Sequence, residues 1–434
     1  MPPTHPRSFG TTPIVNRRLL SLLGLGLAIW ITVPSIKAGE TLTLDEAIAR
    51  ALEENPELLA TRLEVQAREA RISQAGVLPN PEFFVLSEDI GGSGAYEGFA
   101  RSQTTAQVSQ RVELGGKRGA RRDVASSNRD VASGAHDLKR REIVADVRRA
   151  FYTVLVAQHR VHLMEELMGV SMQFSRIVQE RIQAGKIPPI DDVKATAIVA
   201  SAEIDLARSQ RELDSARYGL AAAIGITGPD FGPAQGELFL GSPEVALQEL
   251  IDSLSKSPEL QKAAAEIDER EALLAIERAK RIPDITLTGG YRTLEPTNDH
   301  TFVIGASIPL PLFDRNKGGI LEAQRRVLSA EQARNSVEAQ IKNSLAGAYQ
   351  LYSAAKAEAQ ALQERVLPAN QTSFDAISEG YRLGKYGYLD VLEAQRSLFQ
   401  SRLQLLRVLG DLHAAAAEIE RITGKELLTE ARHE

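Results

Sequence analysis

A seven-residue repeat of apolar side chains runs through the second half of this chain. Apolar residues recur there at alternating spacings of four and three: Ile341, Leu345, Ala348, Tyr352, Ala355, Ala359, Leu362 and Val366. The positions about 198 residues earlier, from Ile143 to Met168, are apolar in the same register. A seam of this kind is typical of helices that supercoil around a neighbour. Both patterns therefore predict long coiled-coil helices, over about 118–184 and 318–383.

These helices are too long for a compact globule. A helix rises 1.5 Å per residue, so about 66 residues make a rod of about 100 Å. The pattern predicts a second helix after each rod, over about 191–224 and 389–422, and a shorter helix before it, over about 44–76 and 244–281. Each half of the chain is thus expected to form an extended helical hairpin that reverses at a Gly-Lys turn.

The two halves of the chain are copies of one unit. The motif at Glu54–Leu58 returns at Lys256–Leu260 with Pro-Glu-Leu in common, and the Gly185-Lys186 turn returns as Gly384-Lys385. An internal repeat of about 200 residues indicates a duplicated structural unit. We expect four parts in the chain: a leader at 1–38, two repeats at 39–230 and 231–424, and a tail at 425–434.

Four segments outside the helices alternate between apolar and polar residues, which is the period of a β-strand. We expect strands over about 81–90, 104–114, 283–293 and 301–311. About ten residues is the length that a tilted strand needs to cross a bilayer. Two surface hairpins on a soluble helical protein would give the same alternation, so these segments alone leave both structures open.

Four strands cannot close into a membrane barrel, because the smallest such barrels have eight strands. Together with rods too long for a globule, the strands therefore predict an oligomer. Three copies would give a twelve-stranded barrel with a ring of helices below it, although composition does not fix the number of copies.

The N-terminal region has the pattern of an export signal. Arg7, Arg17 and Arg18 precede an apolar run from Leu19 to Val33. The run is about 15 residues long, which suits a signal peptide and is short for a membrane-spanning helix. We expect cleavage near Ala38 and export of the mature chain, with an N-terminal membrane anchor as the alternative.

Composition argues against several functional classes. The chain has 57 acidic residues against 51 Lys and Arg, a formal net charge of −6, which argues against nucleic acid as a partner. It has no cysteine, so we expect no disulfide, thiol nucleophile, Cys-ligated zinc or lipidated N-terminal Cys. We find no G-x-S-x-G, H-E-x-x-H or P-loop motif, and so expect neither enzymatic activity nor a cofactor.

Two groups of possible metal ligands lie on the first long helix. His159, His162 and Glu166 could share a helix face, but a group of this kind is more often a solvated stripe. Three thioethers, which can bind soft metals, follow at spacings of four: Met164, Met168 and Met172. The first two of these methionines fall on the apolar seam, which favours core packing. We therefore predict no metal site in this chain.

The chain resembles the TolC-type outer-membrane factors. The residues that carry this resemblance, together with the duplicated architecture, are Leu44-Asp45-Glu46-Ala47, Glu54-Asn55-Pro56-Glu57 and Leu389-Asp390-Val391-Leu392-Glu393-Ala394-Gln395. The resemblance extends over nearly the whole chain, from about Leu42 to Gly424. Two further segments, Glu113–Arg118 and Pro309–Asn316, resemble the CzcC-like heavy-metal branch of that family.

The resemblance implies an α+β membrane protein that forms a homotrimer. Its twelve-stranded β-barrel would lie in the outer-membrane lipid of a Gram-negative bacterium, and its twelve-helix α-barrel would cross much of the periplasm. Many members are lipidated on an N-terminal Cys; this chain has none, so the barrel alone would anchor it.

The implied activity is that of a passive exit duct in a tripartite efflux system. The duct would work with a periplasmic membrane-fusion adaptor and an inner-membrane RND-type pump. The heavy-metal branch implies cobalt, zinc, cadmium, copper or silver as cargo. Drug efflux and type I protein secretion are alternatives for the same duct, and a soluble periplasmic coiled-coil adaptor or scaffold is an alternative of another class.

The resemblance also implies that the helix tips meet the adaptor and close the duct. By position, these tips comprise Gly185, Lys186, Ile190 and Asp191 in the first repeat, and Gly384, Lys385, Leu389 and Asp390 in the second. Turn chemistry explains the same residues, because Gly allows a positive φ and Asp caps a helix.

An acidic pair follows the second turn. Asp390 and Glu393 are three residues apart and share a helix face. By the resemblance, three copies of the pair would form an acidic ring at the tunnel mouth, which would attract cations. The helix macrodipole also favours acids at this position.

Overall fold

The computed structural model describes residues 41–238, 245–425 and 427. These residues belong to the unit formed by residues 38–434. The expected leader at 1–38 and most of the expected tail lie outside the described residues. Among the helices that are described, none is long and apolar enough to span a membrane.

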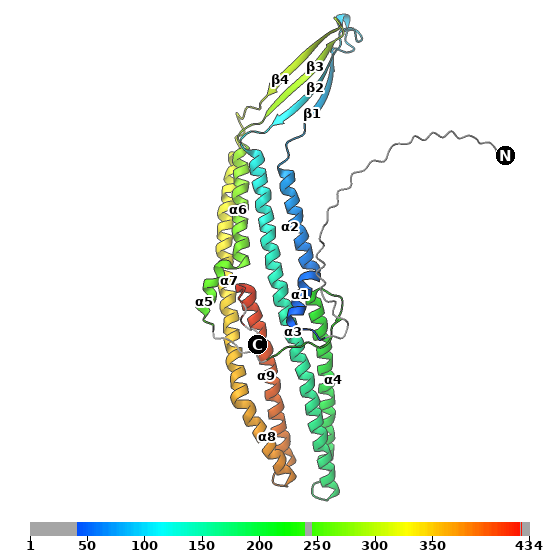
Figure 1. Cartoon of the computed structure of the whole chain (residues 1–434), viewed down its shortest axis with the longest axis vertical. Coiled ribbons are helices and arrows are strands. Elements are labelled where there is room, and N and C mark those ends of the chain that lie inside the picture. The colour runs from blue at the N-terminus through cyan, green and yellow to red at the C-terminus, as the bar shows by residue number, and fades with distance from the viewer. Residues whose placement is uncertain (1–40, 239–244, 426, 428–434) are drawn as a thin grey trace, which may run out of the picture. The chain divides into compact units, whose positions relative to one another are not determined.

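The two repeats have the same order of elements, labelled in Figure 1, except that the second has α7 and α8 where the first has the single helix α3. The first repeat contains α1 Leu44–Glu54, α2 Pro56–Ala75, β1 Glu82–Glu88, β2 Gln103–Val112, α3 Lys117–Gln183 and α4 Ile190–Ile224. The second contains α5 Leu247–Ser253, α6 Pro258–Ala279, β3 Ile285–Leu294, β4 Asp299–Ser307, α7 Lys317–Ala361, α8 Leu367–Arg382 and α9 Tyr388–Thr423.

Each repeat begins with two helices where the sequence pattern predicted one. The expected helices over 44–76 and 244–281 are broken before Pro56 and Pro258. A residue before proline is pushed out of the helical conformation, and proline is well placed at the first position of a helix. Asn55 makes this break a helix start, because its side chain accepts hydrogen bonds from the backbone N–H groups of Glu57 and Leu58.

The long helix of the first repeat is continuous over 67 residues, whereas its counterpart is interrupted. Helical backbone runs from Lys317 to Arg382, close to the expected 318–383, but a π-helical segment, Leu362–Val366, divides it into α7 and α8. Pro368 lies two residues after this segment; it has no N–H, and its ring clashes with the carbonyl of the residue four positions earlier. The apolar seam ends at the same place: its first seven side chains are at most 7% exposed, but Val366 is 39% exposed.

The long helices pack side by side. α3 contacts α2 and α4 in its own repeat and α6 and α9 in the other, and α7 packs against α6 and α9 (Figure 1). The described residues thus place α2 and α4 at one edge of the helices, and α7 and α8 at the other. The segment that joins the repeats packs across α3 and α9, through Gln158 with Ala234 and through His413 with Leu238.

The four strands form one antiparallel sheet in the order β1-β2-β3-β4. Phe83 pairs with Val108, Val108 with Gly289, and Gly289 with Ile304, so these residues share a face. That face is mainly apolar: Phe83, Val85, Ala106, Val108, Leu287, Tyr291, Phe302 and Ile304. Apart from Phe84 and Leu86 of the edge strand β1, the opposite face is mainly polar: Gln103, Thr105, Gln107, Ser109, Arg111 and Arg292.

The fourth strand is shorter than the expected segment 301–311. It ends at Ser307, because Pro309 and Pro311 have no N–H to give to a strand ladder. The large apolar side chains of the sheet are open to solvent in the single chain, with Phe302 82% and Ile304 90% exposed. An exposed apolar face of this kind marks a surface that another molecule covers.

The sheet and the helix tips lie at opposite ends of α3. At its N-terminal end, Lys117 pairs with Asp284 beside β3 at 2.6 Å, and Glu113 pairs with Arg121. The other end of α3 leads into the Gly185 turn. At 1.5 Å per residue, α3 separates the two ends by about 100 Å.

Candidate functional site

The two predicted tips have the same turn. Gly185 and Gly384 both have a positive φ, 68° and 77°. In each turn the glycine N–H and the following lysine N–H donate to carbonyls of the last helical turn, at 2.8–2.9 Å. This is the Schellman arrangement, in which glycine is favoured because a side chain would be strained. The turn explains the glycines of the two tips.

The residues after the turns differ. In the first tip, Asp191 pairs with Lys194 at 2.9 Å and has a part-buried side chain. In the second tip, the Asp390 carboxylate accepts a hydrogen bond from the Gly387 N–H at 2.7 Å and so caps its own helix. Glu393 is exposed at the position equivalent to Lys194. The second tip therefore keeps two exposed carboxylates where the first has an ion pair.

Both tips also present large apolar side chains to solvent. Ile190 is 57% exposed and Leu389 is 66% exposed, and both stand at the start of the returning helix. The neighbouring Lys186 and Lys385 are exposed as well. Side chains of this kind at a helix tip are available to a partner.

An apolar cluster joins the two hairpins just behind the tips. Four helices contribute to its buried members, which are Phe174, Val178, Ala195, Tyr381, Tyr388 and Val391. Burial raises the pKa of Tyr388 to about 12 and also raises the pKa of Tyr381. Both phenols are therefore neutral at physiological pH, and the cluster holds no charge that would oppose packing.

One contact between the hairpins was not expected from the sequence. Arg181 of α3 donates a hydrogen bond to the Tyr381 carbonyl at 2.9 Å, and its guanidinium lies 4.6 Å from the centre of the Tyr381 ring. A cation over an aromatic face is attracted to it. The two residues are 200 positions apart, so no local pattern could reveal the contact. The only sequence signal is that each residue lies just before a Gly-Lys turn.

The possible metal ligands of α3 differ in their burial. His162 is exposed and lies 3.8 Å from Glu165 and 3.4 Å from Glu166. Met164 is 4% exposed and packs with Leu163 and Phe399, in agreement with core packing. Across the described part of the chain, no group of three His, Asp or Glu residues could hold a metal ion.

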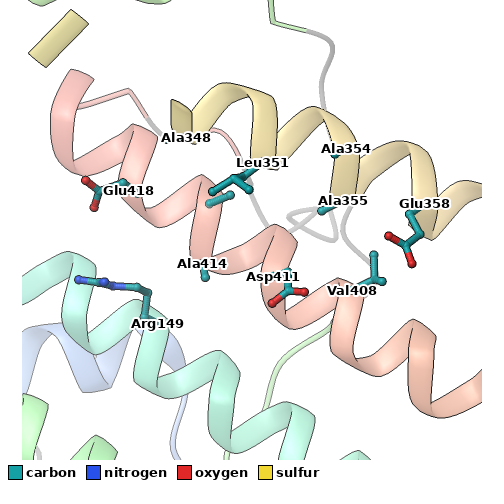
Figure 2. Close-up of a pocket in the computed structure, with 11 residues that line it drawn as sticks. Arg149, Ala348, Leu351, Ala354, Ala355, Glu358, Val408, Asp411, Ala414 and Glu418 are labelled. Atoms are coloured by element: carbon teal, nitrogen blue, oxygen red, sulfur yellow. The ribbon is translucent and has the colours of Figure 1, made fainter. Parts of the chain in front are cut away.

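A groove of about 550 Å³ runs between α7 and α9 at mid-length. Figure 2 shows Glu358 on α7 and Asp411 and Glu418 on α9 beside alanines, with Arg149 on α3. Glu358 accepts a hydrogen bond from Gln404. His413 faces the segment that connects the two repeats. Two positions along a helix correspond to a rotation of about 200°. Asp411, and with it the groove, therefore lies on the opposite side of α9.

Comparisons with known proteins cover most of the described residues. The family model for "Outer membrane efflux protein" matches residues 47–226 and 250–425. The cobalt-zinc-cadmium resistance protein CzcC of Cupriavidus metallidurans is 38% identical over 90% of this chain and 91% of its own length. The nickel-cobalt-cadmium resistance protein NccC of Alcaligenes xylosoxydans xylosoxydans is 28% identical over 74% of this chain and 73% of its own length.

Solved structures share the fold. A crystal structure of CusC has a TM-score of 0.73 at 19% identity and covers 89% of this chain and 93% of its own. The outer membrane protein VceC of Vibrio cholerae also has a TM-score of 0.73, at 20% identity, and covers 88% of this chain and 96% of its own. The long helices and the four-stranded antiparallel sheet are therefore the fold of these channels.

Proposed function

This chain belongs to the outer membrane efflux protein family, and we propose that three copies of it form the exit duct of a tripartite efflux system for heavy-metal cations. The family match confirms the resemblance of the sequence to the TolC-type outer-membrane factors. The family is one of transport proteins, as expected for a chain that is not an enzyme.

One observation supports the duct most strongly: a single helix, α3, runs all the way from the sheet to a tip. A sheet with one apolar, exposed face suits lipid contact, while its polar face suits a water-filled passage. A helix of about 100 Å reaches far beyond a bilayer whose total thickness is about 40–45 Å. When the sheet lies in the outer membrane, α3 is therefore long enough to hold the tips in the periplasm.

The open edges of the sheet and of the helices support assembly from several copies. β1 and β4 are the edge strands of the sheet, and an unpaired edge is completed by another strand. The edge helices carry exposed apolar residues in the single chain, with Ile204 62% and Leu351 68% exposed. We propose that three sheets join edge to edge and that the helices of the three copies do the same.

The proposed cargo comes from the relatives. CzcC, which is 38% identical over nine-tenths of this chain, is a cobalt-zinc-cadmium resistance protein by name. NccC and the nickel and cobalt resistance protein CnrC carry related names. We assign cobalt, zinc and cadmium as the first cargo to test, and then copper and silver, which the resemblance to the heavy-metal branch also implies.

The tips are the proposed docking site for a periplasmic membrane-fusion adaptor, which would link the duct to an inner-membrane RND-type pump. Exposed Ile190 and Leu389 and the lysines of the two turns support this assignment. The duct itself is proposed to be passive. Export of the chain by a leader at 1–38 is part of the same proposal.

Growth on metals tests the proposal. The gene is deleted and restored as wild type or Gly384→Ala, and cells are grown on cobalt, zinc, cadmium, copper, silver and a panel of drugs. We expect sensitivity to metals alone, with full rescue by the wild type and weaker rescue by Gly384→Ala, because Gly384 has a positive φ.

The matched control is Gly169→Ala, at an exposed glycine within α3 where an added Cβ would meet no atom within 4 Å. It should rescue fully. Sensitivity confined to drugs would keep the duct and reject the metal cargo. No sensitivity to either, in a host without a second duct, would reject the efflux function.

A further inference from the structure

A basic groove lies between the two hairpins at the tips. It has a volume of about 660 Å³ and is formed by the ends of α3 and α8 with their turns. Its charged lining residues are Arg176, Glu180, Arg181, Lys186 and Arg382. Four cations thus face one carboxylate, in a chain whose net charge is negative.

Neighbouring acidic groups neutralise only part of the positive charge of these four side chains. Arg382 has one acidic neighbour, Glu379, at 3.7 Å. Arg181 donates to the Tyr381 carbonyl. Within the described part of the chain, Arg176 and Lys186 form no ion pair, and both are exposed. The groove therefore offers at least two cations to an incoming anion.

Helix termini explain part of this charge. Cations favour the C-terminal turn of a helix through the macrodipole, and Arg181 and Arg382 lie in such turns. Arg176 does not, because it lies about two turns before the end of α3 and the effect is confined to the last turn. Lys186 lies beyond the helix. These two residues add positive charge that capping does not require.

The groove also has an apolar part. Ile177 is half-buried in its wall, and Leu383 is 63% exposed at its rim. Apart from Glu180 and Glu379, the acids nearest the two turns are Asp191, Asp192 and Asp390, which lie at the starts of α4 and α9. A ligand that carries carboxylates beside an apolar side chain would complement this surface in charge and in polarity.

We infer that this groove binds an acidic segment of the periplasmic partner, with carboxylates on Arg176 and Lys186 and an apolar side chain against Leu383. The inference rests on the proposed function, since it names the chemistry of the partner that docks at the tips. Guanidinium groups bind carboxylates in a bidentate manner, which gives Arg176 the larger role.

Binding of defined peptides tests the inference. Three synthetic helical-hairpin peptides differ only in their loop, which carries Glu-Leu-Glu, Gln-Leu-Gln or Lys-Leu-Lys. Their affinity for the detergent-solubilised full chain is measured by fluorescence anisotropy. We expect the Glu peptide to bind about tenfold more tightly than the Gln peptide, and the advantage to shrink as salt rises from about 0.05 to 0.3 M, because salt screens exposed charges.

Two double variants separate the groove from overall charge. Arg176→Glu with Lys186→Glu should reverse the preference, so that the Lys peptide binds best. Arg325→Glu with Arg396→Glu changes the net charge equally at exposed positions outside the groove, and it should leave the preference intact. Circular dichroism confirms that each variant is folded.

Equal binding of the Glu and Gln peptides would overturn the inference. So would no binding of the Glu peptide up to about 1 mM, which is a free energy weaker than about −4.1 kcal/mol. An equal loss of the preference for the Glu peptide in the Arg325→Glu, Arg396→Glu control would also overturn it. The growth assay is separate. If metal resistance persists while the peptides show no preference, the inference fails and the proposed function stands.

Discussion

The two helix tips share a backbone and differ in their charges. Gly185 and Gly384 make the same turn, with the same two hydrogen bonds. The next helix then begins with the Asp191–Lys194 pair in one repeat and with Asp390 and Glu393 in the other. Duplication has preserved what the backbone requires, and the side chains beyond the turn have been free to acquire separate roles.

The interior of the tips differs as well. Tyr381 is 1% exposed at the centre of the apolar cluster, whereas the equivalent residue of the first repeat, Ile182, lies at its margin. Tyr381 also receives the Arg181 contact. The second tip is therefore expected to depend on one buried ring, and the first tip is not.

Replacement of the two equivalent residues should have the most unequal effect. Tyr381→Ala is expected to cost about 3–5 kcal/mol of tip stability, because it removes a fully buried aromatic side chain. Ile182→Ala should cost about 1 kcal/mol, since Ile182 is only half-buried. Hydrogen exchange of the tip amides measures both. Tyr381→Phe serves as the control and should keep most of the protection, and equal losses at the two positions would refute the asymmetry.

Removal of carboxylates should reduce the cation preference more at the second tip than at the first. Asp390→Asn with Glu393→Gln removes six carboxylates from the proposed trimer, and we expect cation preference to fall several-fold, which corresponds to about 1 kcal/mol. Asp191→Asn should change it less, because Lys194 lies 2.9 Å from that carboxylate. Reversal potentials in planar bilayers measure the preference, and unchanged values in the double variant would remove the acidic ring.

Replacement of the two turn glycines should show the smallest difference in stability between the tips. Gly185→Ala and Gly384→Ala each place a side chain on a residue with positive φ, at a cost of about 1 kcal/mol. The two costs should agree within about 0.5 kcal/mol, because neither position has a neighbour closer than 3.9 Å to the added carbon. Denaturant midpoints of the two variants test this, and a clear inequality would show that the turns are not equivalent.

Sequence periodicity predicted most of the fold, because it records local geometry. The apolar seam from Ile341 to Leu362 is buried as expected, and the strand segments carry the alternation that forms one sheet. The breaks at Pro56, Pro258 and Pro368 could have been expected from the proline rules, but a π-helical segment as the response to Pro368 could not. Its form depends on how the flanking helices pack.

The site was predictable only where one short motif defines it. The Gly-Lys turns and the capping role of Asp390 lie within a few residues of one another. The Arg181–Tyr381 contact and the basic groove join α3 to α8, and their residues are about 200 positions apart. Contacts of this kind arise from tertiary packing, which no local pattern records.

Ion flow through the purified full chain tests the central claim most directly. The protein is reconstituted in a planar bilayer, and the reversal potential is measured under gradients of KCl and of ZnCl₂. The proposed duct predicts discrete channels that prefer cations and carry zinc, with the preference reduced in the Asp390→Asn, Glu393→Gln variant. Channels that prefer anions or exclude zinc would contradict a cation-exporting duct.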